Sequence, residues 1–173
     1  IDRSGSMDGL RIINLIKALA IFLESLPDDS YFNVVSFGST FEPLFGSSTE
    51  LSSVRYNEEN LNKALNTIKS FDADLGGTEI FDPLEAILST EMRSGYPKLV
   101  FLLTDGNVMN ADQVVQMIKR KLDFARVYTV GIGNGVSSSF IQRMAEAGKG
   151  KYEFVKDEDN LEEKAINLLH SSI

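Results

Sequence analysis

Five short side chains that carry oxygen atoms fall in three glycine-containing stretches of the sequence. DRSGSM contributes Asp2, Ser4 and Ser6, DLGGTE contributes Thr78, and LLTDG contributes Asp105. Hydroxyl and carboxylate oxygens suit hard cations such as Mg²⁺, which take an octahedral set of ligands and usually keep some waters. Short ligands require a close approach of the backbone, which the neighbouring glycines permit. These residues therefore predict binding of a divalent cation, provided that the fold brings the three stretches together.

Each stretch taken alone is also typical of an ordinary turn. Asp-x-Ser-Gly-Ser can cap backbone groups before a helix, and Gly-Gly-Thr and Thr-Asp-Gly are common in loops and turns. Only the combination favours a shared site, because the stretches occur in this order and two of them directly follow strand-like residues.

The composition is that of an ordinary globular domain and excludes several classes of partner. Of the 173 residues, 43% are apolar and 24% are charged, and the net charge is −8 without a basic run. Nucleic acids and anionic membrane surfaces are bound through clustered Lys and Arg, so neither is an expected partner. No stretch approaches ~18 consecutive apolar residues, the length of a membrane-spanning helix. The absence of cysteine excludes thiolate metal sites and slightly favours the cytoplasm over secretion.

Strand-like and helix-like segments alternate along the chain. Helices are predicted at 10–26, from Asn57 to Ile68, from Asp82-Pro83, at 110–122 with Asn110 and Gln113 as a capping box, at 140–147 and at 160–170. Strands are predicted at 31–37, 40–45, 99–104, 126–132 and 151–155, and Pro43 places the second of them at a sheet edge. This alternation predicts an α/β fold with a mostly parallel sheet, in which ligands bind beyond the carboxyl ends of the strands.

The set DRSGSM, GGT and LLTDG resembles the metal-ion-dependent adhesion site (MIDAS) of von Willebrand factor type A domains. The similarity continues through YFNVVSFG and VYTVGIGNG and covers nearly the whole chain. It implies a single domain over residues 1–173 with a three-layer, Rossmann-like α/β fold. In this fold the central sheet is mostly parallel, one edge strand is antiparallel, and helices cover both faces.

The segments SLPDDSYFNVVSFGSTFEPLF and ADLGGTEIFDPL are similar to one branch of this family. Its members carry an N-terminal VIT domain and include the inter-alpha-trypsin inhibitor heavy chains and the vault poly(ADP-ribose) polymerase. This branch has intracellular and secreted members.

The resemblance also implies roles for the matching residues. Ser4 and Ser6 would bind Mg²⁺ or Mn²⁺ directly, Asp2 would act through water, Thr78 would bind directly when a ligand is present, and Asp105 would often act through water. The remaining position would be filled by water or by a carboxylate of a partner protein. The predicted function is a non-enzymatic, metal-dependent protein-interaction domain. The alternative is a scaffold domain of a larger protein in which metal is optional.

The central strand of such a sheet is represented here only by Ile1, directly before Asp2. We therefore expect the natural chain to continue upstream, with a VIT domain as the candidate neighbour. With a strand of roughly 5 residues shortened in this way, the first loop is expected to be frayed, or the gap to be filled by another chain.

Enzymatic alternatives fit the sequence less well. A phosphatase with an aspartyl nucleophile needs a second acid two residues after Asp2, where this chain has Ser4. GIGNG at 131–135 lacks the third glycine of a dinucleotide site. Serine hydrolysis would need a histidine beside the serine. The single histidine, His170, lies in the predicted last turn of the final helix, where the helix dipole favours a cation and so explains the residue without catalysis.

Overall fold

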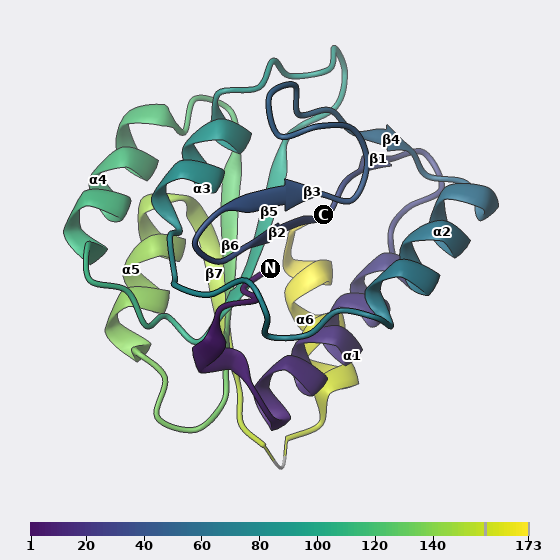
Figure 1. The fold of residues 1–173 in the computed structure, drawn as a ribbon. Helices are drawn as coiled ribbons and strands as arrows, with labels where there is room; N and C mark the ends of the chain where they lie inside the picture. The colour runs from purple at the N-terminus through teal and green to yellow at the C-terminus, as the bar shows by residue number, and fades with distance from the viewer. Residues whose placement is uncertain (158, 173) are drawn as a thin grey trace.

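The computed structural model describes residues 1–157 and 159–172, which form a central sheet between two layers of helices (Figure 1). The helices are α1 (Leu10–Glu24), α2 (Glu58–Ile68), α3 (Phe81–Leu88), α4 (Ala111–Lys121), α5 (Ser138–Ala147) and α6 (Leu161–Ser172), with a short 3-10 helix η1 (Gly5–Met7). The strands are β1 (Tyr31–Phe32), β2 (Val35–Phe37), β3 (Phe41–Pro43), β4 (Val54–Arg55), β5 (Leu99–Thr104), β6 (Arg126–Ile132) and β7 (Lys149–Val155).

The main sheet is parallel except at one edge. Strands β5, β6 and β7 pair in parallel, and β3 pairs antiparallel with β2. Residues 1–3 lie between β2 and β5: the Arg3 amide donates to the Phe37 carbonyl at 2.8 Å, and the Asp2 amide donates to the Leu103 carbonyl at 2.9 Å. The order is therefore β3, β2, residues 1–3, β5, β6 and β7. This confirms the predicted α/β fold with a mostly parallel sheet and one antiparallel edge strand, which contains Pro43. The expectation of a frayed first loop is wrong, because these backbone hydrogen bonds hold residues 1–3 in the central position of the sheet.

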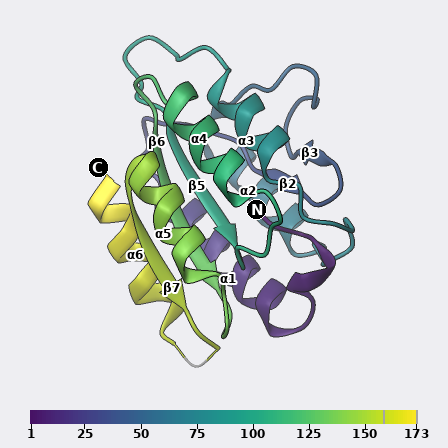
Figure 2. The same ribbon diagram turned by 90° about the vertical axis from the view of Figure 1, so that its left-hand side faces the viewer.

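Each face of the sheet is covered by its own apolar core. Helices α1, α2 and α6 pack on one face, and α3, α4 and α5 pack on the other, which is the face turned toward the viewer in Figure 2. The buried apolar residues of α1 recur at helical spacing and are Ile12, Leu15, Ala18, Leu19, Phe22 and Leu23. The connections between strands and helices at the carboxyl ends of the strands remain free to carry a site. None of the helices in the described part of the chain is long and apolar enough to span a bilayer.

The single strand predicted at 31–37 is wrong, because the structure interrupts it after β1. The side chain of Asn33 takes over the local hydrogen bonding: its Oδ1 accepts from the amides of Val34 at 2.8 Å and Phe45 at 3.1 Å. Its Nδ2 donates to the carbonyls of Phe45 at 2.9 Å and Ser52 at 2.7 Å. As a result β1 pairs with β4 in a separate two-stranded sheet, while β2 pairs with β3.

Replacing Asn33 with alanine is expected to lower the free energy of unfolding by about 2 kcal/mol, since partly buried backbone groups of two segments lose their partners. Urea denaturation measures this difference. Asn66→Ala is the matched control, because Asn66 is exposed on α2, and a change within about 0.5 kcal/mol is expected there. Equal stabilities for the two variants would show that the Asn33 contacts contribute nothing.

The predicted helix starts are confirmed only in part. Asn57 caps α2 through a hydrogen bond from the Asn60 amide to Asn57 Oδ1 at 2.8 Å. The capping box at Asn110 is wrong: its backbone has φ −114° and ψ 41°, away from the extended conformation of a capping residue, and its side chain caps no amide of the described residues. Helix α3 starts at Phe81 rather than after Asp82, which leaves Pro83 within the first turn, where its missing amide is tolerated.

Candidate metal site at the carboxyl ends of the strands

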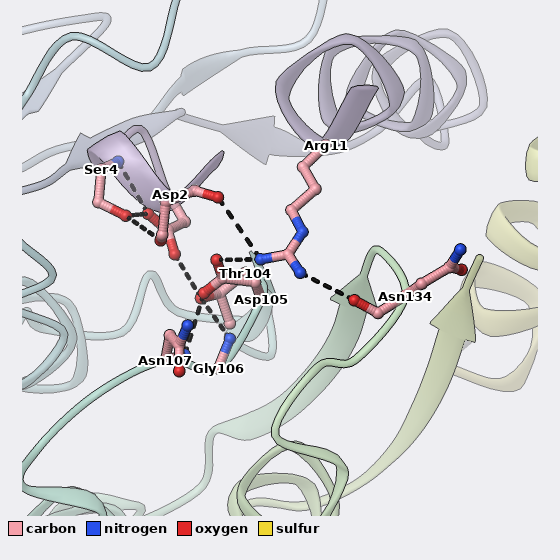
Figure 3. Close-up of polar contacts among 9 residues, drawn as sticks. Asp2, Ser4, Arg11, Thr104, Asp105, Gly106, Asn107 and Asn134 are labelled. Atoms are coloured by element: carbon pink, nitrogen blue, oxygen red, sulfur yellow. Dashed lines mark hydrogen bonds and ion pairs between the residues drawn. The ribbon is translucent and has the colours of Figure 1, made fainter. Parts of the chain in front are cut away.

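The carboxylate of Asp2 is the centre of a buried hydrogen-bond network (Figure 3). Its Oδ1 accepts from the Ser4 amide at 2.9 Å and from Ser4 Oγ at 2.6 Å, and its Oδ2 accepts from Thr104 Oγ1 at 2.6 Å. Asp2 and Thr104 are both fully buried, and Ser4 is 1% exposed. Because Ser4 directs its proton to Asp2, the lone pairs of the Ser4 hydroxyl remain available to a cation.

The charge on Asp2 is costly in the absence of a cation. Burial raises the pKa of the Asp2 carboxyl, the hydrogen bonds from Ser4 and Thr104 lower it in part, and the nearby Asp105 raises it further, with a net upward shift. An opposite charge close to a carboxylate favours its ionised form. The network around Asp2 therefore favours a bound positive charge.

The hydroxyls of Ser4 and Ser6 have a spacing suited to a shared octahedral ion. Their Oγ atoms lie 3.1 Å apart. Two neighbouring ligands of an octahedral Mg²⁺, each at about 2.1 Å from the ion, lie about 3.0 Å apart. Ser6 is exposed while Ser4 is buried, so the pair links the interior network to the surface.

The segment that carries Thr78 lies along the first loop, which consists of residues 2–7. The Gly5 amide donates to the Gly76 carbonyl at 2.8 Å, and the Leu75 amide donates to the Arg3 carbonyl at 3.0 Å. Thr78 lies two residues after Gly76 and is half-buried. Its hydroxyl forms no hydrogen bond with residues 1–157 or 159–172, so it stays available for a ligand.

Asp105 enters the site directly after β5. Its carboxylate is buried: Oδ1 accepts from the Asn107 amide at 3.0 Å, and Oδ2 accepts from Arg11 Nη1 at 2.9 Å. The preceding residue, Thr104, binds Asp2. The structure thus joins Asp2 to Ser4 and Ser4 to Ser6 by side-chain hydrogen bonds and connects Asp105 to them through its neighbour. Thr78 lies on an adjoining loop, without a side-chain hydrogen bond to these residues.

Sequence reasoning missed Thr104 and Arg11. Arg11 lies in the first turn of α1, and its Nη2 donates to the Asn134 carbonyl at 2.8 Å (Figure 3). A cation is unfavourable at the N-terminus of a helix because of the helix dipole. An arginine in the first turn of a predicted helix is therefore a sequence signal for a specific acidic partner.

The oxygen atoms at the carboxyl ends of the strands include hydroxyls as well as carboxylates. Within the described ranges, no group of three or more His, Cys, Asp or Glu side chains could hold a metal ion. Hydroxyl and carboxylate oxygens such as those of Ser4 and Asp2 suit Mg²⁺ or Mn²⁺ rather than a softer metal.

The fold is shared with solved structures of other proteins. Manganese-loaded TRAP protein of Plasmodium vivax aligns with a TM-score of 0.70 at 20% identity, over 98% of this chain and 69% of that chain. Proximal thread matrix protein 1 of the mussel byssus, solved with a zinc-occupied MIDAS motif, aligns with a TM-score of 0.67 at 18% identity, over 95% and 43%. At these identities the likeness establishes the fold.

The sequence itself establishes the family. The profile of the von Willebrand factor type A domain matches residues 1–154, and the chain belongs to this family. A von Willebrand factor A domain-containing protein of Dictyostelium discoideum is 40% identical over 98% of this chain. Von Willebrand factor A domain-containing protein 5B1 of Mus musculus is 36% identical over 100% of it. The chain spans 18% and 14% of the lengths of these two relatives.

Proposed function

We propose that this domain binds one divalent cation, Mg²⁺ or Mn²⁺, at a MIDAS and through it an acidic group of a partner protein. The observation that carries the proposal is the 3.1 Å spacing of the Ser4 and Ser6 hydroxyls beside the buried carboxylate of Asp2. Further support comes from the manganese-loaded and zinc-occupied structures of the same fold.

The residues divide into neutral and charged ligands. Ser4, Ser6 and Thr78 would hold the cation directly, while Asp2 and Asp105 would hold it through water. When bound, the cation would supply a positive charge, and because its direct ligands would be neutral it would keep its attraction for a carboxylate from outside. The two buried carboxylates would offset part of the charge from behind, and Asp2 orients the Ser4 hydroxyl through their hydrogen bond of 2.6 Å.

We further propose that the domain is non-enzymatic and belongs to the VIT-associated branch, with a VIT domain upstream in a cytoplasmic protein. The hydroxyls of Ser4 and Ser6 are engaged with a carboxylate and with each other rather than with a histidine. The single histidine, His170, lies in the last turn of α6. The relatives are several times longer than this chain, which leaves room for further domains.

Thr78→Val is expected to weaken Mg²⁺ binding by roughly tenfold or more and to leave the melting temperature in EDTA unchanged. The substitution removes a hydroxyl that makes no hydrogen bond to the described residues, and it keeps the branched shape. Isothermal titration with MgCl2 measures the affinity, and melting with and without MgCl2 measures the stabilisation. At a hundredfold excess over Kd, wild type should gain about 2.7 kcal/mol.

Thr40→Val is the matched control, since Thr40 is exposed at the turn between β2 and β3. It should bind Mg²⁺ as wild type does. The metal proposal would be overturned by a wild-type protein that shows no heat of binding and no thermal shift. Equal affinities of Thr78→Val and Thr40→Val would exclude Thr78 as a ligand of the cation in the absence of a partner protein.

A scaffold domain with optional metal is the second candidate, and one observation favours it. The ion pair between Arg11 and Asp105 at 2.9 Å satisfies a buried carboxylate of the site without any metal. A scaffold would retain its partner in EDTA, whereas a MIDAS would release it. Co-purification from the natural source in buffers containing either MgCl2 or EDTA distinguishes the two.

A further inference from the structure

The guanidinium of Arg11 is fixed in place beside Asp105. Its Nη1 donates to Asp105 Oδ2 at 2.9 Å and lies 3.5 Å from the Ser6 carbonyl, and its Nη2 donates to the Asn134 carbonyl at 2.8 Å. Gly133 makes room for the stem of the arginine: its φ is +106°, and a Cβ there would lie 2.5 Å from Nε and 2.9 Å from Cγ of Arg11. The arginine is therefore accommodated by three separate segments of the chain.

The electrostatics explain what the arginine does there. The Asp105 side chain is 0% exposed, while that of Arg11 is 26% exposed. A buried carboxylate without a counter-charge is strongly unfavourable, so Arg11 neutralises Asp105 from the solvent side. The helix dipole opposes a cation in the first turn of α1, and the ion pair with Asp105 offsets that cost.

We infer that Arg11 sets the affinity of the site for its divalent cation by competing for Asp105. The inference rests on the proposed function, because it concerns the same cation site. The guanidinium and a divalent cation are both positive and need the same carboxylate, so they repel each other in its vicinity. Arg11 Nη1 donates to Asp105 Oδ2, and a cation that draws on the same carboxylate displaces Arg11 from it.

The release of Arg11 also has a structural consequence. The same guanidinium holds the Asn134 carbonyl, in the segment between β6 and α5, and approaches the Ser6 carbonyl. Once Arg11 leaves Asp105, these contacts are lost or rearranged together. Binding of the cation is therefore coupled to the segment around Gly133 and Asn134, which contains none of the proposed ligands.

Arg11→Met tests the inference because it removes the charge and keeps an unbranched stem. Isothermal titration with MgCl2, and separately with MnCl2, gives the affinity of wild type and variant. We expect the variant to bind about tenfold more tightly or better, since the Coulomb repulsion is relieved, and to melt at a lower temperature in EDTA. The matched control is Arg143→Met, which removes an equal charge from an exposed ion pair with Asp112 and should bind as wild type.

Each outcome bears on a different claim. If wild type and Arg11→Met bind with the same Kd, the inference is overturned and the proposed function stands. If Arg11→Met binds more weakly, Arg11 positions Asp105 for the cation instead of competing with it, which also overturns the inference. If neither protein binds either metal, the proposed function fails and the inference fails with it.

A second measurement on wild type keeps the test independent of the folding of the variant. In ¹H–¹⁵N spectra, the Arg11 Nε–H resonance, identified by its absence in Arg11→Lys, should shift when MgCl2 is added. The amides of Gly133 and Asn134 should shift with the same concentration dependence. Resonances that stay unchanged at saturating MgCl2 would overturn the inference.

Discussion

Replacing Arg3 with alanine is expected to lower the free energy of unfolding by about 3 kcal/mol, because a buried side chain loses its packing and its charge-assisted hydrogen bonds. The Arg3 side chain is only 7% exposed, but its two acidic partners, Glu42 and Asp74, are 63% and 60% exposed. Water can therefore solvate both carboxylates after the substitution. What is lost is mainly the packing and the hydrogen bonds of the guanidinium itself.

Those contacts connect the first loop to two other segments. Arg3 Nη2 donates to Asp74 Oδ1 at 2.7 Å, and Nε donates to the Asp72 carbonyl at 3.1 Å. Nη1 lies 3.4 Å from both Glu42 Oε1 and Ser36 Oγ. Through Asp72 and Asp74 the arginine also holds the segment that leads to Thr78. A loss of metal affinity should therefore accompany the loss of stability.

Urea denaturation in EDTA measures the stability of Arg3→Ala, and titration with MgCl2 measures its affinity. Arg3→Lys is expected to recover less than half of the lost stability, because an ammonium cannot reproduce the planar set of donors. Arg143→Ala is the control: its pair with Asp112 is exposed, and a cost below about 1 kcal/mol is expected. An Arg3→Ala protein as stable as this control would contradict the assigned role.

The parts of the structure that depend on local pattern could be predicted from the sequence. The apolar run 99–104 forms β5, as predicted. The alternation of strands and helices along the chain correctly indicated a parallel sheet. Asp2, Ser4 and Ser6 are close because they are neighbours in one loop. Asp105 was expected at the same edge, since the carboxyl ends of parallel strands meet there.

The parts that depend on one side chain contacting a distant segment could not be predicted. Arg11 and Asp105 form an ion pair although they are 94 residues apart in the sequence, and Thr104 donates a hydrogen bond to Asp2, 102 residues away. Asn33 interrupts a strand through hydrogen bonds to segments 12 and 19 residues away. Each of these residue types is also common in positions without such contacts, so its type and local pattern do not identify its partner.

Asp2→Asn is expected to abolish the stabilisation by Mg²⁺, which in wild type amounts to about 2.7 kcal/mol at a hundredfold excess over Kd. The carboxamide has the shape of the carboxylate. Its oxygen can still accept from the Ser4 amide and hydroxyl, and its nitrogen can donate to Thr104 Oγ1, where wild type accepts at 2.6 Å. The fold should therefore be retained while the negative charge is lost.

The same variant should be more stable than wild type in EDTA at pH 7. Burial raises the pKa of Asp2 in the folded protein above its ordinary value. A folded-state pKa above the unfolded value means that ionisation is less favourable in the folded state, so stability falls as the pH rises from the unfolded pKa through the folded pKa. Below the unfolded pKa this cost is absent, and above the folded pKa it is fully present. Asparagine does not ionise and avoids the cost at every pH.

Melting curves recorded with EDTA and with MgCl2, from about pH 4, near the ordinary pKa of an aspartate, up to pH 7, separate the two effects. Asp8→Asn is the control, because Asp8 is exposed at the end of the same loop and its replacement changes the net charge equally. It should keep the response to Mg²⁺ and the pH dependence of wild type. If Asp2→Asn retained the full response to Mg²⁺, the cation would be bound without the Asp2 carboxylate, and the charge balance proposed for this site would be wrong.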